Sequence, residues 1–226
     1  LVRKSFKDLD LVIADIDLDR AEAVAKKVAG RALQFDATDP LSIAETVKGA
    51  DLVFNAVGPF YRFGLGIIQA AIANKVNYID ICDEYDVTLT LVEDKALDQA
   101  AKDADIFALF GMGFSPGITN LVAKWACNLL DAPKTVEIAS SIPYWPNLGM
   151  TVNDHMLYSM SGNVPQFVNG KIEYLPAWGG EKEYIFKGEH GRQIIGYMGH
   201  PEGVSMGYSI KGLENPYIRF RWVEED

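Results

Sequence analysis

The stretch LVIADIDLDRAEAVAKKV, residues 11–28, is a short apolar run that ends in acidic residues and passes at once into an amphipathic segment. The apolar run is typical of a strand buried on both faces of a parallel sheet, and the segment after it has helical periodicity. In a dinucleotide-binding domain this order describes the second strand, whose final acid binds the ribose of the adenosine. We therefore predict a doubly wound parallel α/β sheet of the Rossmann type.

The residues before this stretch do not supply the first strand of such a fold or its glycine-rich phosphate loop. The opening residues 1–4, LVRK, are typical of the last turn of the helix that follows that loop. The first strand is central in the strand order 3-2-1-4-5-6, so without it the two halves of the sheet share no neighbour. We expect the sequence to be a fragment, or to lack upstream residues, and not to fold stably alone.

Strands and helices alternate as far as residue 130, which predicts a nucleotide-binding domain over residues 1–131. An amphipathic helix is predicted at 64–74, and Ser115-Pro116 is typical of the N-cap and first residue of a helix that runs to Leu130. Short connections between such units favour right-handed crossovers. The four further predicted strands are 32–37, 51–57, 77–82 and 105–110.

Residues 132–226 are richer in Gly, Pro and aromatic residues, and we predict a second, α+β domain there with an antiparallel sheet. Alternating stretches at 135–142, 171–175 and 183–188 predict strands with one exposed face. Asn169-Gly170 is typical of a two-residue hairpin turn.

The net negative charge argues against some classes of binding partner. The 226 residues carry 21 Lys and Arg against 31 Asp and Glu, a net charge of −10. Nucleic acids and anionic membranes need a basic face, so we expect neither as a partner. No apolar run is long enough to span a bilayer. Cys82 and Cys127 lie in apolar surroundings that favour reduced core thiols.

Strand ends are the candidate cofactor site, because ligands of open α/β sheets bind at the carboxyl ends of the strands. Asp15 ends the second strand, where a carboxylate binds ribose hydroxyls and repels a 2′-phosphate. This position predicts NAD, although the nearby Arg20 leaves NADP possible. The alternative is an acid that caps the next helix, a task for Asp17 or Asp19. The predicted cofactor-binding residues are Asp15, Ile16, Asp36, Ala37, Asn55, Ala56, Val57, Gly58, Pro59 and Phe60.

The later members of this set also have purely structural explanations. Asp36 precedes Thr38 and Asp39, either of which can cap a helix that starts at Pro40, and Gly58-Pro59 suits a tight turn. At the switch point of the sheet, however, small residues let a cofactor lie against the backbone. The two roles are compatible.

Two further patterns concern anions and metals. The glycine-rich segment GMGFSPG, residues 111–117, precedes a helix and could offer free N–H groups to an anion, or could simply be a capped helix start. His155, His190 and His200 have no metal-ligand spacing with one another or with a cysteine, so we predict no metal site.

Taken together, residues 11–25, 36–61, 70–84 and 111–123 resemble the saccharopine dehydrogenase-like family, and the segment GMGFSPGITN is the most specific element. The resemblance covers about residues 11–130. It implies an NAD(P)-dependent oxidoreductase that transfers hydride at the C–N bond of an amino acid-like substrate of saccharopine or lysine type, in lysine metabolism. We expect a cytoplasmic homodimer.

Within this resemblance Asp83 and His155 are the candidate proton carriers, because both titrate and both should face the cleft. For Asp83 the alternative is a solvated acidic loop. The predicted substrate-binding residues are Tyr85, Met112, Gly113 and Phe114.

One departure from the family concerns the substrate. Relatives carry a helix with an arginine for the substrate carboxylate, whereas this chain passes from Ser159-Met160-Ser161 almost directly to GNVPQF. The departure favours a changed substrate, or a nucleotide-binding sensor without turnover as the alternative function. An aldehyde or homoserine-type dehydrogenase would need a reactive cysteine or lysine at the switch point. Cys82 is the nearby thiol, and its apolar flanks argue against a lowered pKa.

Overall fold

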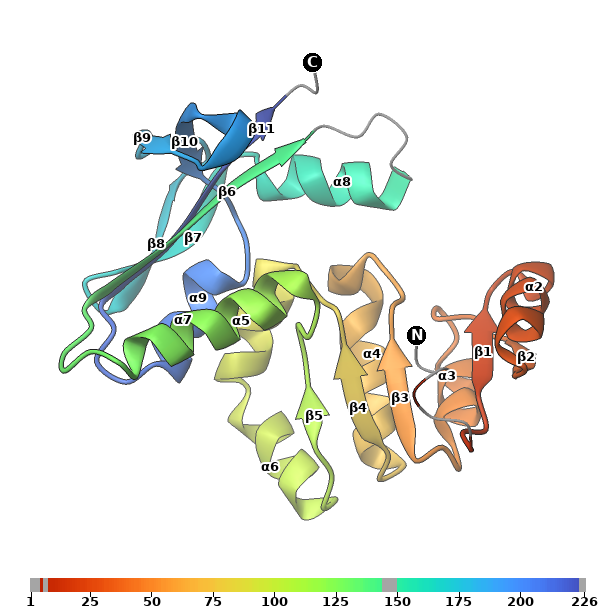
Figure 1. Cartoon of the computed structure of the whole chain (residues 1–226). Coiled ribbons are helices and arrows are strands. Elements are labelled where there is room, and N and C mark those ends of the chain that lie inside the picture. The colour runs from red at the N-terminus through yellow and green to blue at the C-terminus, as the bar shows by residue number, and fades with distance from the viewer. Residues whose placement is uncertain (1–4, 6–7, 144–149, 224–226) are drawn as a thin grey trace.

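The computed structural model describes residues 5, 8–143 and 150–223. The predicted helical turn at residues 1–4 lies outside them. In the first half of the chain strands and helices alternate, as the sequence predicts (Figure 1). The elements are β1 (Val12–Asp15), α2 (Leu18–Val28), β2 (Arg31–Gln34), α3 (Pro40–Val47), β3 (Leu52–Asn55), α4 (Phe60–Ala73), β4 (Asn77–Asp80), α5 (Tyr85–Glu93), α6 (Lys95–Asp103), β5 (Ala108–Leu109), a π-helical turn (Phe114–Ile118) and α7 (Thr119–Cys127).

These five strands form two separate parallel sheets within the part of the chain that the structure describes. Strand β1 pairs with β2, whereas β3, β4 and β5 form the other sheet in that order. Figure 1 shows the β1–β2 pair set apart from β3. The expectation that the two halves share no strand neighbour is thus confirmed, and the expectation about stability stays a prediction.

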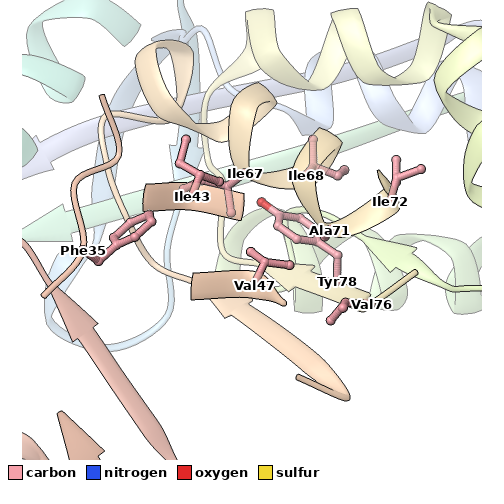
Figure 2. Packing of buried hydrophobic residues seen from close by; sticks show 9 residues of the cluster. All are labelled: Phe35, Ile43, Val47, Ile67, Ile68, Ala71, Ile72, Val76 and Tyr78. Atoms are coloured by element: carbon pink, nitrogen blue, oxygen red, sulfur yellow. The ribbon is translucent and has the colours of Figure 1, made fainter. Parts of the chain in front are cut away.

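A buried apolar cluster holds the two parallel sheets together (Figure 2). Phe35 follows β2, Ile43 and Val47 come from α3, and Tyr78 comes from β4. Helix α3 therefore packs on α4 and bridges the sheets. The members of the cluster are Phe35, Ile43, Val47, Ile67, Ile68, Ala71, Ile72, Val76 and Tyr78.

The second half of the chain builds a mixed sheet and a hairpin. Its elements are β6 (Thr135–Pro143), α8 (Met150–Ser159), β7 (Asn163–Val168), β8 (Lys171–Pro176), β9 (Lys182–Ile185), a 3₁₀ turn (Gly188–His190), β10 (Arg192–Tyr197), α9 (Glu202–Ser209) and β11 (Asn215–Val223). The predicted hairpin is confirmed: β7 pairs with β8, and Asn169 and Gly170 both have positive φ, as a type I′ turn requires.

The prediction of an antiparallel sheet is only partly right. The strand order is β6-β11-β10-β9, and β6 and β11 run parallel along their whole length. The intervening segment from α8 to α9 brings the chain back to the start of β6, so β11 enters the sheet in the same direction. Helix α9 then packs on α7 through a cluster that includes Cys127 and Met206. The boundary at residues 131 and 132 stays a prediction.

Ser115 has extended φ and ψ angles directly before Pro116, which is the backbone geometry of the predicted N-cap. Its hydroxyl donates to Glu202, a contact that a local N-cap pattern cannot reveal. Cys82 and Cys127 are buried and free, as predicted. Among the described residues, no helix combines the length and apolar character needed to cross a membrane.

Candidate functional site

Asp15 and Asp17, at the end of β1, make different hydrogen bonds. Asp17 is the N-cap of α2 and accepts the Arg20 N–H at 3.1 Å, which is the capping role foreseen for this position. Asp15 Oδ1 accepts the Asp17 N–H at 3.0 Å. None of the described hydrogen bonds involves the other carboxylate oxygen of Asp15. Ile16 is 64% exposed, which suits contact with a bound molecule rather than a core position.

Asp36 is held in a local turn after β2. Its Oδ1 accepts both the N–H and the O–H of Thr38, and these hydrogen bonds hold the pKa of Asp36 below its usual value. Asp39 caps α3 through the Leu41 N–H, so the predicted capping role falls to Asp39. Asp36 and Ala37 are both half-buried beside the end of β2.

Asn55 shapes the loop after β3 instead of facing outward. It is buried, its Nδ2 donates to the Tyr78 hydroxyl at 2.9 Å, and its Oδ1 accepts the Val57 N–H at 2.9 Å. Ala56 is exposed, whereas Gly58 and Pro59 are half-buried. The hydrogen bonds of Asn55 therefore fix this loop from its buried side.

Glu84 ties this loop to the end of β4. Its carboxylate accepts the N–H groups of Phe60, at 2.9 Å, and of Tyr61, which open α4. Phe60 is buried. Burial raises the pKa of Glu84 to about 7, although these two hydrogen bonds act in the opposite direction. The sequence placed Glu84 in an acidic loop without revealing this role.

Asp80, the last residue of β4, holds the glycine-rich loop at Gly111 against the end of that strand. Its Oδ1 accepts the N–H of Gly111 at 2.7 Å and of Cys82 at 3.0 Å, and its Oδ2 accepts the Tyr78 hydroxyl at 2.8 Å. Burial raises the pKa of Asp80. The loop beyond Gly111 carries the predicted substrate-binding residues, of which Met112 and Phe114 are exposed and Gly113 is half-buried.

The structure brings the two predicted proton carriers together. Asp83 follows β4 and His155 lies on α8, and Asp83 Oδ2 is 3.5 Å from His155 Nε2. The Asp83 side chain is 41% exposed and that of His155 only 10%. Burial lowers the pKa of His155, while the Asp83 carboxylate opposes this shift. Ser159 Oγ lies 3.3 Å from the same Nε2.

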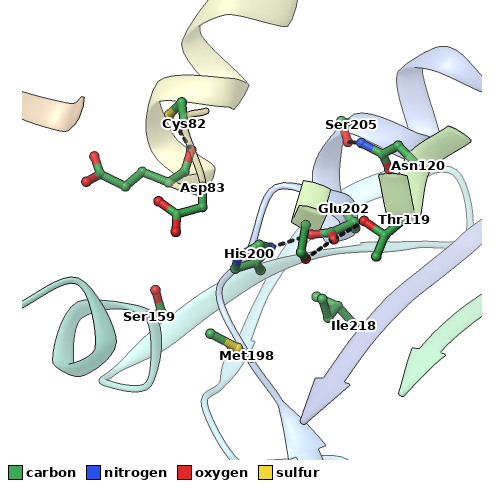
Figure 3. A network of polar contacts seen from close by, with 12 residues as sticks. Cys82, Asp83, Thr119, Asn120, Ser159, Met198, His200, Glu202, Ser205 and Ile218 are labelled. Carbon is green, nitrogen blue, oxygen red and sulfur yellow. Dashed lines mark hydrogen bonds and ion pairs between the residues drawn. The ribbon is translucent and has the colours of Figure 1, made fainter. Parts of the chain in front are cut away.

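His200 and Glu202 complete the cluster, and the sequence reasoning missed both. The Glu202 carboxylate contacts His200 Nδ1 and accepts the hydroxyl of Thr119 (Figure 3). It also accepts the hydroxyl of Ser115. Burial alone would raise the pKa of Glu202, but His200 and these hydroxyls outweigh it and lower the pKa to about 2. Burial acts to lower the pKa of His200, and the Glu202 carboxylate raises it instead. The spacing His-x-Glu before a helix was the available signal.

Three tyrosines line the neighbouring surface. The rings of Tyr85 and Tyr158 stack with centroids 5.0 Å apart, and Tyr61 contacts Tyr158 at 5.8 Å. Gly199 permits this packing, because a Cβ there would lie 2.6 Å from the Tyr85 ring. The predicted substrate-binding residue Tyr85 thus belongs to an aromatic wall that joins α4, α5 and α8.

Comparison with known proteins gives a consistent picture. Residues 1–109 match the family model described as the saccharopine dehydrogenase NADP binding domain. The carboxyaminopropylagmatine dehydrogenase of Synechocystis sp. is 26% identical over 125 residues, which are 52% of this chain and 31% of that protein. The saccharopine dehydrogenase-like oxidoreductase of Mus musculus is 31% identical over 120 residues, 53% of this chain and 27% of that protein. The match therefore spans less than a third of either relative.

A solved structure shares the fold. Apo saccharopine dehydrogenase (L-Glu forming) from Saccharomyces cerevisiae superposes with a TM-score of 0.68 and 18% identity, covering 96% of this chain and 50% of that one. The predicted α/β class and the predicted resemblance are confirmed. The family model supports a nicotinamide dinucleotide cofactor.

Proposed function

We propose that the protein is an NAD(P)-dependent oxidoreductase acting at the C–N bond of an amino acid-like substrate, because residues 1–109 match the model of the saccharopine dehydrogenase NADP binding domain. The observation that carries the proposal is the meeting of Asp83 and His155 beside the loop that Glu84 holds. Two titratable groups at the switch point of the sheet are where hydride transfer would need a proton carrier.

The residues present fit a dinucleotide. Asp15 offers a carboxylate oxygen at the end of β1 for the adenosine ribose, and the half-buried Gly58 and Pro59 offer backbone for the nicotinamide end. A bound NAD(P) would supply the hydride acceptor or donor. We propose NAD as the preferred form, since the Asp15 carboxylate repels a 2′-phosphate.

A side chain of this protein is proposed to accept the proton that the substrate nitrogen loses. In amine oxidation, the C–H electron pair leaves with the hydride and the N–H proton must go to a base. Asp83 is the base with access to a substrate, and His155, 3.5 Å away, orients its carboxylate. The loop at Met112 to Phe114 and the Tyr85 ring form the walls proposed to hold the substrate.

Steady-state kinetics of the full-length protein, followed by NADH absorbance with lysine and saccharopine, test this proposal. Asp83→Asn should lower kcat by about 10²-fold or more with cofactor affinity unchanged, as the loss of a general base does. Asp154→Asn, an exposed neighbour of His155 on α8, is the matched control. Activity of Asp83→Asn within threefold of the parent would exclude the base. Cofactor binding without turnover on any amine would favour the sensor instead.

The proposal extends to a cytoplasmic homodimer in lysine metabolism. Helix α7 supports self-association, because Leu121, Val122 and Trp125 are each more than half exposed on it. Sedimentation velocity of the full-length protein tests this point, with Trp125→Glu as the variant that should shift a dimer to a monomer.

A further inference from the structure

Three side chains that lie far apart in the sequence meet at one point between the two halves of the chain. Asp83 follows β4, His155 comes from α8 and His200 precedes α9. One ligand atom from each lies within 4.8 Å of the other two. We propose that Asp83, His155 and His200 form a binding site for a divalent transition-metal ion of the Zn²⁺ or Co²⁺ type.

The setting of His200 supports metal binding. The Glu202 carboxylate holds its Nδ1, so Nε2 is the nitrogen left to bind an ion. Glu202 is itself fixed by the hydroxyl donor of Thr119 (Figure 3) and by that of Ser115, both on the other half of the chain. A carboxylate on the far nitrogen is the usual support of a metal-binding histidine, because it sets both the tautomer and the ring orientation.

His155 is poorly satisfied without an ion. Its Nε2 has only the long contacts to Asp83 and Ser159, at 3.5 and 3.3 Å, and its Nδ1 is buried with no hydrogen-bond partner among the described residues. Buried polar groups normally have partners, and a metal ion bound at Nε2 would give that nitrogen one, although Nδ1 would keep none among the described residues.

The donor set indicates the class of ion and an entry path. Two imidazole nitrogens and one carboxylate suit Zn²⁺, Co²⁺ or Ni²⁺ better than Ca²⁺ or Mg²⁺, which prefer oxygen ligands. Both histidines are buried, whereas the 41% exposed Asp83 opens the cluster to solvent. Three protein ligands leave one tetrahedral position for water or substrate.

A bound ion would also act on the reaction. It would occupy the Asp83 carboxylate proposed as the base and the His155 imidazole proposed to orient it, so Zn²⁺ should inhibit turnover. This second consequence rests on the proposed function, whereas binding of the ion does not.

The first experiment is titration of the chelator-treated, full-length protein with CoCl₂, read by the visible d–d absorption of Co²⁺. We expect one ion per chain, with bands of tetrahedral intensity that Zn²⁺ abolishes. His200→Gln and Asp83→Asn should each weaken binding at least tenfold, and Glu202→Gln by about 10- to 100-fold as outer-shell losses do. His190→Gln, at an exposed histidine, is the control and should bind as the parent does.

The possible results distinguish the proposed metal site from the proposed role of Asp83 in proton transfer. Absence of the bands, or equal binding by the parent and by Asp83→Asn, would overturn the metal site whatever the enzyme does. Asp83 is half-exposed, so this variant stays informative even if Glu202→Gln fails to fold. Binding without inhibition of turnover would leave the site in place and overturn the proton-transfer role of Asp83.

Discussion

The carboxylate of Glu84, directly before α5, accepts the N–H of Phe60, the first residue of α4, at 2.9 Å. It also accepts the next N–H, so a side chain from one strand end caps the helix that follows another. Free N–H groups at a helix start need acceptors, and the Pro59 position before this helix provides no side-chain cap. Glu84 thereby fixes the loop proposed to lie against the nicotinamide.

Replacing Glu84 by Gln should therefore weaken both the fold and cofactor binding. One acceptor oxygen and the negative charge are lost, so we expect the free energy of unfolding to fall by about 1–3 kcal/mol. Cofactor affinity should fall in parallel, because the loop is less ordered. Urea unfolding and calorimetric titration measure the two effects. Glu45→Gln, on an exposed face of α3, should change neither.

Asp15 should determine which nicotinamide dinucleotide binds. Asp15→Ser removes the carboxylate that repels a 2′-phosphate, and the ratio of NAD to NADP affinity should fall by about tenfold or more, or ~1.4 kcal/mol. Asp17→Ser retains an N-cap residue for α2 and is the control. A parent protein that already prefers NADP would contradict the assignment, and so would an unchanged ratio.

The hydroxyl of Tyr78 should contribute to stability in addition to the packing of its ring. The hydroxyl accepts from Asn55 and donates to Asp80, and all three side chains are buried. Tyr78→Phe leaves two buried polar groups without this partner, at a cost of about 1–3 kcal/mol. Tyr61→Phe, at an exposed ring, should cost less than about 0.5 kcal/mol. Equal unfolding free energies of the two variants would show that the network contributes nothing.

Tyr208 should give the protein a pH-dependent contact between its halves. Its hydroxyl on α9 donates to Glu93 Oε1 on α5 at 2.6 Å, and burial, followed by this hydrogen bond, raises its pKa from 10.0 to about 12. The folded state thus retains the phenol proton more strongly than the unfolded state does. The stability gained is fully present below pH 10 and is lost as pH rises through about 12.

Comparison of the parent with Tyr208→Phe isolates this contact. The contact is largely exposed, so we expect a difference of only about 0.5–1 kcal/mol in unfolding free energy at neutral pH. That difference should disappear in alkaline solution. A difference that persists above the raised pKa would assign the effect to packing rather than to the hydrogen bond.

Local pattern was sufficient for much of the first half of the chain. Apolar runs and helical periodicity predicted the strands that end at Asp15 and Asn55, because each signal lies within a few neighbouring residues. The meeting of Asp83 and His155 could be foreseen only as two residues facing one cleft. Their separation of 3.5 Å depends on where α8 docks.

Local sequence patterns could not predict the contacts between segments that are distant in the chain. Nothing in the alternation of 135–142 indicates that β6 pairs parallel with β11, since periodicity gives the exposed face and not the partner. Ser115 matches a local N-cap pattern, yet its hydroxyl serves Glu202 from the other half of the chain. The His-x-Glu spacing links His200 to Glu202 locally, but nothing in the sequence places His200 beside Asp83 and His155.

The two ends of the proposed cofactor would contact different parallel sheets. Asp15, proposed for the adenosine end, stands on the β1–β2 pair, whereas Gly58, proposed for the nicotinamide end, follows β3 in the other sheet. A molecule held at both ends would bridge these two sheets of the described residues, which the apolar cluster of α3 and α4 also joins. If that molecule binds the folded chain and not the unfolded one, the melting temperature should climb with the logarithm of its concentration above Kd.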